Sequence, residues 1–225
     1  MRFNSAMWRL GVALLAALAL QEQNQEEHSA VPTITFVRVW EAFTPQNIDV
    51  TIQSTGPAKY ISRNPFKPPT EGNPDPEYVL KFTMSAANRD KLFRDARQAN
   101  FFQGDFSYKK HTVASTGKKT LIYADQARHV ETTFDYSENK YIKEITDIFQ
   151  GLSNTIEYGR KLQFLHRFDK LGLEAELKGM EDAAENHNLA EVQVIAPTLE
   201  GIANDPAVLN IARERARRLL AKKSL

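Results

Sequence analysis

The chain has 225 residues, of which 42% are hydrophobic and 25% are charged, and its formal net charge is +1 at pH 7. A chain of this length and composition can bury a substantial core, which excludes an intrinsically disordered protein. It contains no cysteine, which excludes a disulfide framework, a lipid-modified cysteine and a thiolate metal site. The near-neutral charge indicates no particular class of partner.

The amino-terminal segment is typical of a secretory signal peptide. Arg2 and Arg9 precede an apolar run over residues 10–20, and Ala17-Leu18-Ala19 supplies the small residues of a cleavage site. An uncleaved membrane anchor is the alternative, but this run is only about half of the roughly 20 apolar residues that a membrane span needs.

This pattern divides the start of the chain into a signal peptide, residues 1–19, and a polar linker, residues 20–32. We expect cleavage after Ala19, so that the mature chain begins at Leu20. The protein is then expected in the periplasm or outside the cell, with membrane contact only through the signal peptide.

Residues 33–41 and 47–53 predict a β-hairpin. The first segment is rich in β-branched and aromatic residues, and in the second every other residue is apolar, as in a strand with one buried face. The turn Phe43-Thr44-Pro45-Gln46 joins them. A further turn, residues 54–57, leads to a short strand over residues 59–62.

A proline-rich segment, residues 65–76, interrupts the sheet, because its five prolines and Gly72 cannot pair continuously with a neighbouring strand. Alternating residues 78–84 then predict another strand. Ser85 is placed to cap a helix that ends near Asn100. The inward residues of this helix are expected to be Leu92, Phe93 and Ala96.

The pair Phe101-Phe102 follows this helix, and we interpret it as a plug between helix and sheet. Gly104 and the turn Ser115-Thr116-Gly117-Lys118 bracket two more extended segments, the second over residues 120–124. The last strand is predicted over residues 128–136. Alternation puts Val130, Thr132, Phe134 and Tyr136 on one of its faces and His129, Glu131, Thr133 and Asp135 on the other.

The chain is organised around one long amphipathic helix, predicted from Ser137 to Leu165. An apolar stripe recurs with the helical repeat in Tyr141, Ile145, Ile148, Phe149, Leu152 and Ile156. Asp135 or Ser137 is expected to cap its first turn, and Glu138 to complement its dipole. Strands precede this helix and helices follow it, which predicts an antiparallel sheet with helices on one face.

Several of these motifs together resemble a small secreted bacterial domain of unknown function. They are the hairpin with Ile48-Asp49-Val50-Thr51-Ile52, Gly56 and Tyr60, the helix from Leu92 that ends in Asn100-Phe101-Phe102, and Gly117-Lys118-Lys119 before a strand. The resemblance covers about residues 33–152 and implies an α+β fold but no activity. Members often carry a Cys-x-x-Cys-like turn in the first hairpin. The corresponding turn here has no cysteine, so the resemblance implies no redox or metal role for it.

Beyond residue 158 the sequence predicts an all-helical annex. The apolar stripe continues through Leu162, Leu165, Phe168 and Leu173, and Leu177 and Met180 belong to another helix that ends near residues 186–188. Pro197 then either kinks a helix or starts a new one.

The last helix is expected to start at Asn204-Asp205-Pro206. Its inward residues should be Val208, Ile211, Ala212, Ala216, Leu219 and Leu220. Residues 199–220 resemble the inner part of a HEAT-type helical repeat. Such a pair needs a neighbour to bury its faces, and we expect the far end of the long helix to serve.

Charge is divided within the annex. Residues 170–205 carry eight acidic and two basic side chains, whereas residues 207–225 carry six basic side chains, Arg213, Arg215, Arg217, Arg218, Lys222 and Lys223, and one acidic. We interpret these as complementary faces of neighbouring helices. The alternative is a polyanion or membrane-surface site on the basic helix. Nucleic acid is not the expected partner, because this helix has no aromatic residue for stacking.

The best candidates for catalysis or metal binding are His129, Glu131 and Asp135. Alternate residues of a strand project to one face, and imidazole with carboxylates suits acid–base chemistry or zinc. A solvated strand face is the favoured interpretation. His111 could join from a neighbouring strand, and we interpret His166 as a partly exposed interface histidine. No phosphate-binding loop, nucleophile elbow or His-Glu-x-x-His motif occurs, so no catalytic, cofactor-binding or metal-binding residue is assigned and no cofactor is expected.

The sequence thus predicts an α+β fold. An antiparallel sheet with helices on one face, residues 33–157, is joined by the long helix to a C-terminal all-helical annex, residues 158–225. The predicted function is that of an exported non-catalytic interaction or scaffold module of the cell envelope, whose partner is another envelope protein or a second copy of the chain. The alternatives are a hydrolase or metal-dependent enzyme that uses His129, Glu131 and Asp135, and binding of polyanions or membrane surfaces through the C-terminal helix.

Overall fold

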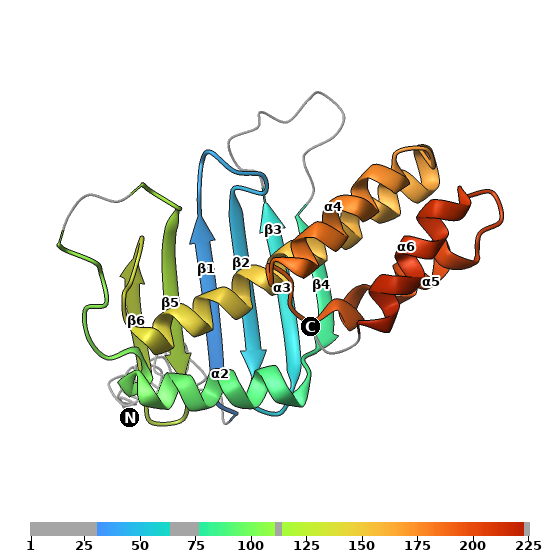
Figure 1. Cartoon of the computed structure of the whole chain (residues 1–225). Coiled ribbons are helices and arrows are strands. Elements are labelled where there is room, and N and C mark those ends of the chain that lie inside the picture. Colours follow the sequence, from blue (N-terminus) through green and yellow to red (C-terminus); the bar gives the residue numbers. More distant parts are fainter. Residues whose placement is uncertain (1–30, 64–76, 111–113, 223–225) are drawn as a thin grey trace, which may run out of the picture.

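The computed structural model describes residues 31–63, 77–110 and 114–222. The predicted signal peptide, nearly all of the predicted linker and the proline-rich segment lie outside the described residues. The described chain forms one antiparallel sheet with helices on one face, and a group of helices beyond the β4 edge (Figure 1). The predicted α+β fold is confirmed.

Six strands make the sheet in the order β4-β3-β2-β1-β5-β6, and every neighbouring pair is antiparallel. They are β1 (Thr33–Val39), β2 (Asn47–Gln53), β3 (Pro57–Arg63), β4 (Tyr78–Thr83), β5 (Lys118–Ala124) and β6 (His129–Phe134). The extended segment predicted just after Gly104 is not a strand. Residues 103–110 form a loop instead, in which the Tyr108 backbone N–H donates to the Tyr136 carbonyl at 2.9 Å.

Side chains alternate between the two faces of the sheet, so one face is apolar and buried. In β2 the inward residues Ile48, Val50 and Ile52 are at most 2% exposed, while the residues between them are half-buried. β1 alternates in the same way, but its last inward residue is Arg38. The inner face of the sheet therefore carries a buried charged side chain at the end of β1.

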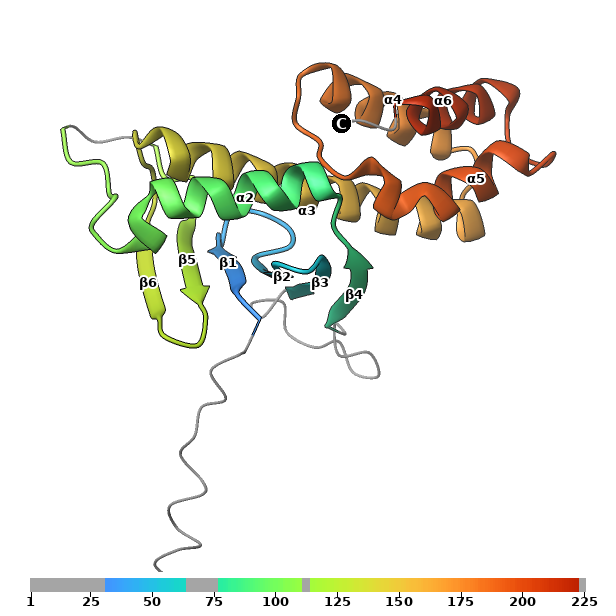
Figure 2. The ribbon, with the colours of Figure 1, turned by 90° about the horizontal axis from the view of Figure 1, so that it is seen from below.

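Two helices, α2 (Ala86–Gln98) and α3 (Lys140–Phe168), cover the inner face and lie side by side (Figure 2). The Ser85 hydroxyl caps α2, as predicted, and accepts a hydrogen bond from the Asn88 N–H at 3.4 Å. After α2, the short 3₁₀ turn η2 (Asn100–Phe102) buries Phe102 completely. This confirms the interpretation of the Phe pair as a plug.

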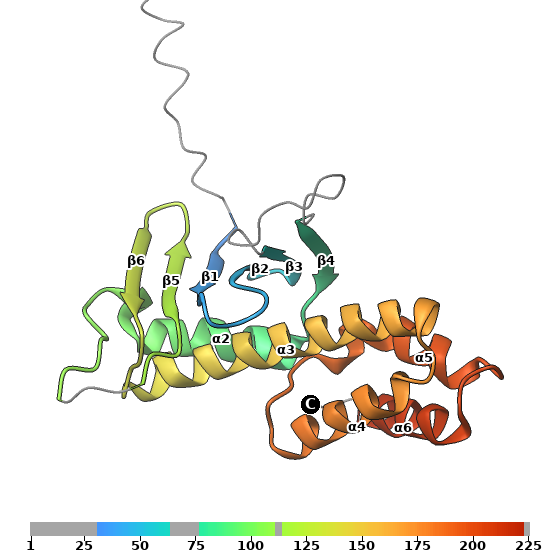
Figure 3. The same cartoon turned by 90° about the horizontal axis from the view of Figure 1, so that it is seen from above.

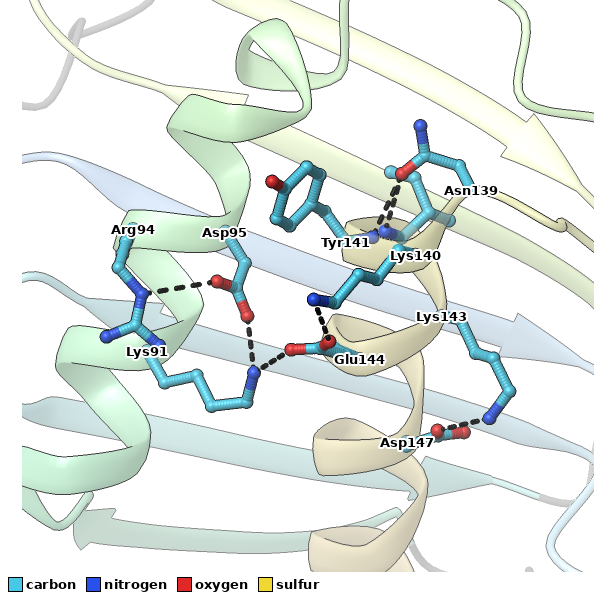
Figure 4. Close-up of polar contacts among 10 residues, drawn as sticks. Lys91, Arg94, Asp95, Asn139, Lys140, Tyr141, Lys143, Glu144 and Asp147 are labelled. Atoms are coloured by element: carbon cyan, nitrogen blue, oxygen red, sulfur yellow. Dashed lines mark hydrogen bonds and ion pairs between the residues drawn. The ribbon is translucent and has the colours of Figure 1, made fainter.

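Helix α3 begins later than predicted, because Asn139 caps it. The Asn139 Oδ1 atom accepts hydrogen bonds from the N–H groups of Tyr141 at 3.0 Å and Ile142 at 3.2 Å (Figure 4). The expectation that Asp135 or Ser137 caps this helix is wrong. The Ser137 hydroxyl accepts from the Asn139 N–H outside the helix, and Asp135 binds a neighbouring turn.

A cluster of charges ties α2 to α3 (Figure 4). The Lys91 ammonium contacts the Asp95 carboxylate at 2.7 Å and also the Glu144 carboxylate. Arg94 lies 3.4 Å from Asp95, and Lys140 lies 3.9 Å from Glu144. The Asp95 side chain is only 4% exposed, and its charge is matched by these partners.

Helix α3 contributes to two separate hydrophobic cores. Its first half packs against the sheet and α2, with Ile145 and Phe149 fully buried and Ile148 half-buried. Its second half supplies Leu162, fully buried, to the core of the annex. No helix that the structure describes, α3 included, is long and apolar enough to span a membrane.

The annex consists of α4 (Leu173–Glu185), η3 (Val192–Ile195), α5 (Ala196–Asn204) and α6 (Asn210–Ala221), with α4 and α6 side by side (Figure 3). Elements α4, η3 and α5 pack on the end of α3, as expected for α5, whereas α6 packs mainly on α4 and α5. Pro197 lies in the first turn of α5, so a new helix starts there and the kink is excluded.

Three expectations for the annex are wrong. Helix α6 starts at Asn210 rather than at residues 204–206, because Asp205 ends the preceding helix and its carboxylate accepts from the Ala207 N–H at 2.8 Å. Ile211 and Phe168, both predicted to point inward, are 51% and 64% exposed.

The annex and the sheet meet at Glu191, which is fully buried. Its carboxylate accepts hydrogen bonds from the Ser85 N–H at 2.8 Å, the Ser85 hydroxyl at 2.5 Å and the Asn88 amide at 2.6 Å. A carboxylate of the annex thus completes the N-terminus of α2, where the helix dipole favours negative charge. Close by, Gly159 of α3 touches Ile195, and an added Cβ would overlap it.

Candidate functional site

A cleft of about 760 Å³ lies between the β1–β2 turn, the second half of α3 and one side of α4. This volume is within the usual range of ligand pockets. Both halves of the chain contribute to its walls. The residues that line it include Arg38, Phe43, Pro45, Ile48, Asn154, Glu157, Tyr158, Arg160, Lys161, Phe164, Glu176 and Asn188.

Arg38 is the last inward residue of β1 and is 4% exposed. Its Nε and Nη2 atoms are buried and donate to no acceptor in the part of the chain that the structure describes. Its Cζ atom lies 4.9 Å from the centre of the Phe43 ring and 5.8 Å from that of Trp40, and these two rings stack on each other at 5.0 Å. The guanidinium therefore has aromatic contacts but lacks a hydrogen-bond acceptor for these two donors.

A second buried cation next to Arg38 shows the usual arrangement. Lys119 pairs with Arg38 in the register of β1 and β5 and is 3% exposed. Its ammonium donates to the Asp135 carbonyl at 2.7 Å, the Thr116 hydroxyl at 2.8 Å and the Gly117 carbonyl at 3.0 Å. Buried polar groups are almost always paired in this way, so the two free donors of Arg38 are unusual; Asn47 Oδ1, Thr155 Oγ1 and Arg213 Nε are the other such atoms in the described chain.

Burial lowers the pKa of Arg38 from its usual value, and Tyr60 and Glu157 act in the opposite direction. An arginine keeps its proton in proteins, because its ordinary pKa lies far above neutrality. The cleft therefore holds a permanent positive charge.

Glu157 of α3 supplies an acidic group on the same side of the sheet. Its Oε1 atom accepts hydrogen bonds from the Tyr60 hydroxyl at 2.8 Å and the Ser62 hydroxyl at 2.9 Å. Burial and the neighbouring carboxylate raise the pKa of Tyr60, so this hydroxyl stays protonated and donates. The other oxygen of Glu157 lies 3.7 Å from Arg160.

The charges that line the cleft do not balance. Three basic residues, Arg38, Arg160 and Lys161, face two acidic ones, Glu157 and Glu176. Lys161 forms an ion pair with Glu176, and Arg160 is the cation nearest to Glu157. Arg38 is the base of these five that forms no ion pair with a described residue, although Glu157 acts on its charge at longer range.

A smaller hollow of about 460 Å³ adjoins the cleft. Arg38, Phe43, Asn154 and Asn188 line both spaces. The Asn154 amide donates to the Asn188 carbonyl at 3.0 Å and so links α3 to the segment after α4. Trp40 belongs to the smaller hollow, so the Arg38 side chain lies where the two spaces meet.

The predicted row of His129, Glu131 and Asp135 is not assembled into a site. His129 and Glu131 are exposed on the outer face of β6. Asp135 lies beyond the end of β6 and accepts a hydrogen bond from the Thr116 N–H at 2.9 Å. The described residues contain no group of three or more His, Cys, Asp or Glu residues that could hold a metal ion.

The other histidines that the sequence singled out lie elsewhere. His111 falls outside the described residues. His166 Nε2 lies 2.9 Å from the Asp205 carboxylate, and the His166 side chain is 28% exposed. This matches the interpretation of His166 as a partly exposed interface histidine.

The basic side chains of α6 face the acidic side chains of α4. Arg215 contacts Glu174 at 3.0 Å and also Glu181, and Arg218 contacts Glu181 at 2.8 Å. Arg217 donates to the Ala203 carbonyl at 2.8 Å. The interpretation of the divided charge as complementary helix faces is confirmed for Arg215 and Arg218.

Neither Arg38 nor Glu157 is among the residues that the sequence singled out. One signal was present, because Arg38 follows Ile34 and Phe36 at the spacing of the inward row of β1. A charge in such a row marks either the exposed end of a strand or a buried site. Which of the two applies depends on whether a helix covers that end of the strand. The covering helix, α3, comes about a hundred residues later in the chain, so the local pattern cannot show it.

No protein-family model matches the sequence. The search of curated proteins found no match either. The resemblances to a small secreted domain and to a HEAT-type repeat therefore stay predictions.

Proposed function

We propose that the protein is an exported, non-catalytic interaction module of the cell envelope, which holds an acidic group of its partner in the cleft at Arg38. The observation that carries this proposal is the buried guanidinium with two free donors. Burying a charge without hydrogen-bond partners is costly, and an anion that pairs with it removes that cost. An acidic ligand is therefore favoured at this position.

The polar groups around the cleft suit binding better than catalysis. A general base or nucleophile has to reach the reacting atom with a free lone pair. Glu157 is held by Tyr60 and Ser62, and Glu176 is held by Lys161. These fixed pairs give the cleft a defined shape and charge.

The two alternative functions have less support. The row from His129 to Asp135 is split between the open face of β6 and a turn, which disfavours a hydrolase or metal site there. Arg215 and Arg218 already pair with acidic residues of α4, which leaves less free charge on α6 for a polyanion.

A protein partner fits the rim of the cleft. Phe43 and Phe164 line the cleft and are 40% and 60% exposed. Exposed aromatic side chains beside a buried arginine are typical of the central residues of protein interfaces. That this partner is an envelope protein or a second copy of the chain rests on the predicted signal peptide.

A cross-linking experiment in the native cell envelope tests this proposal. Wild-type protein, Arg38→Met and the control Arg94→Met, which lies on α2 outside the cleft, are compared at equal expression. We expect one cross-linked partner with wild type and Arg94→Met, and its loss with Arg38→Met. Equal cross-linking of all three, or an intact mass that still starts at Met1 in the membrane fraction, would contradict the proposal.

A further inference from the structure

We infer that the acidic group held at Arg38 is a single carboxylate attached to an apolar group, as at the carboxyl end of a peptide or in a free arylalkanoic acid. This inference rests on the proposed function and specifies the chemistry of the ligand. Three properties of the cleft carry it: the shape of the free donor edge, the balance of charge and the apolar walls.

The two free donors of Arg38 form one edge of its guanidinium. Nε–H and the facing N–H of Nη2 point in the same direction, and their spacing matches the two oxygens of a carboxylate. Both atoms lack an acceptor among the described residues. A carboxylate can therefore accept two parallel hydrogen bonds there, which a single amide or hydroxyl oxygen cannot.

The charge of the cleft favours a ligand with one negative charge. Three basic and two acidic side chains line it, so one carboxylate neutralises the excess. A phosphate monoester carries about −1.5 to −2 charges at neutral pH. It would leave additional negative charge beside Glu157 in a partly enclosed space.

The walls next to the guanidinium are apolar. Phe43 lies 4.9 Å from the Arg38 Cζ atom, Ile48 is 2% exposed and pairs with Arg38 in the register of β1 and β2, and Pro45 also lines the cleft. On α3, Tyr158 and Phe164 add aromatic surface to a wall that also carries the polar residues Ser153, Asn154, Glu157, Arg160 and Lys161. A group attached to the bound carboxylate would meet the apolar side chains, so an apolar or aromatic group is favoured over a polar one.

Trp40 offers a direct reporter of binding, because its ring stacks on Phe43 and lies 5.8 Å from the guanidinium carbon. The chain has two tryptophans, and Trp8 lies in the predicted signal peptide. Trp8→Phe makes Trp40 the single tryptophan whether or not that segment is cleaved. This variant is titrated with 3-phenylpropionate, 3-phenylpropionamide, inorganic phosphate, and a peptide that ends in phenylalanine with a free or an amidated carboxyl end.

We expect saturable binding of the free acids and at least about 30-fold weaker binding of the matched amides, which is the usual size of a lost buried charge pair. Arg38→Met should abolish the difference between acid and amide, and Arg94→Met should leave it unchanged. Tighter binding of the peptide acid than of the small acid would identify a chain end as the ligand. Equal or weaker binding would identify a free acid, which keeps carboxylate recognition but contradicts the protein partner of the proposed function. Both results support the inference.

Other results would overturn it. Equal affinity for acid and amide, or tighter binding of phosphate than of the acids, refutes carboxylate recognition. The proposed function is then still decided separately by the cross-linking result. If no probe binds and cross-linking does not depend on Arg38, both the carboxylate inference and the proposed function are refuted. Without ligand, Arg38→Met should unfold at a higher urea concentration than wild type. A lower urea midpoint for Arg38→Met would show that the guanidinium makes stabilising contacts within the protein, so that its edge is not free for a ligand.

Discussion

Replacing Glu191 tests whether one buried carboxylate holds the annex on the sheet. Glu191→Ala removes the acceptor of four hydrogen bonds: three from α2 and its cap, donated by the Ser85 N–H, the Ser85 hydroxyl and the Asn88 amide, and one from the nearby Gln193 amide. Hydrogen bonds to a charged group contribute about 1.5–3 kcal/mol each, but burying the carboxylate costs several kcal/mol. Because removing one partner of a buried ionic cluster typically costs about 3–5 kcal/mol, we expect a loss of that size in the free energy of unfolding.

Urea unfolding, followed by Trp40 fluorescence for the sheet and by circular dichroism for the helices, measures this loss. Glu191→Gln keeps the shape and one acceptor oxygen but loses the charge, so it should cost less than Glu191→Ala. Glu185→Ala serves as the control, because Glu185 is exposed at the end of α4. A change below about 1 kcal/mol for Glu191→Ala would refute the reasoning, since the usual loss is several times larger.

Three further predictions concern α3, the outer strand face and the α5–α6 junction. Leu162→Ala should cost about 2–5 kcal/mol in urea melts, because Leu162 is fully buried in the annex core. Changing His129 and Glu131 together to Ala should alter stability by less than about 0.5 kcal/mol, since both are exposed. Lys170 is the chief cause of the lowered pKa of Asp205. Asp205 therefore stabilises the fold above the pKa of an unfolded aspartate, and this contribution is lost as the pH falls through the lowered folded value, so Asp205→Asn should flatten thermal stability across the acid range.

Each of these predictions has a contrary outcome. Hydrogen exchange should show faster exchange over residues 199–220 in Leu162→Ala, whereas Lys143→Ala, on the exposed face of α3, should change nothing. Equal protection of these amides in Leu162→Ala and wild type would mean that the annex does not depend on α3. A loss of several kcal/mol for the His129 and Glu131 double variant would show a buried or ligating pair. An unchanged acid profile for Asp205→Asn would show that its ion pairs are not formed in solution.

The parts of the fold that depend on local patterns could be predicted from the sequence. Alternation in residues 47–53 identifies β2, and a serine followed by a helical repeat identifies the Ser85 cap of α2. The start of α3 could not be predicted, because Asp135, Ser137 and Asn139 can all cap a helix. Only the tertiary structure shows that Asp135 is bound to Thr116, which leaves Asn139 at the first turn.

The candidate site could not be predicted because it depends on contacts between distant segments. Arg38 belongs to the first strand and Glu157 to the helix that follows the last strand, and they line the same cleft only after α3 has packed across the sheet. Glu191 is similar, because its partners Ser85 and Asn88 lie 106 and 103 residues earlier in the chain. Periodicity in the sequence identifies which face of a helix or strand is buried, but not which other element packs against that face.

The place of β1 in the sheet has a consequence for how the chain folds as it emerges. One edge of β1 pairs with β2 in a short hairpin, but the other edge pairs with β5, and Thr33 meets Ala124 across 91 residues. Local hairpins form quickly, whereas pairings that close long loops form slowly. Until β5 arrives, β1 is an open edge with unpaired N–H and C=O groups, on which a second chain could add a strand. During synthesis, the centre of the finished sheet is therefore the edge that most needs protection.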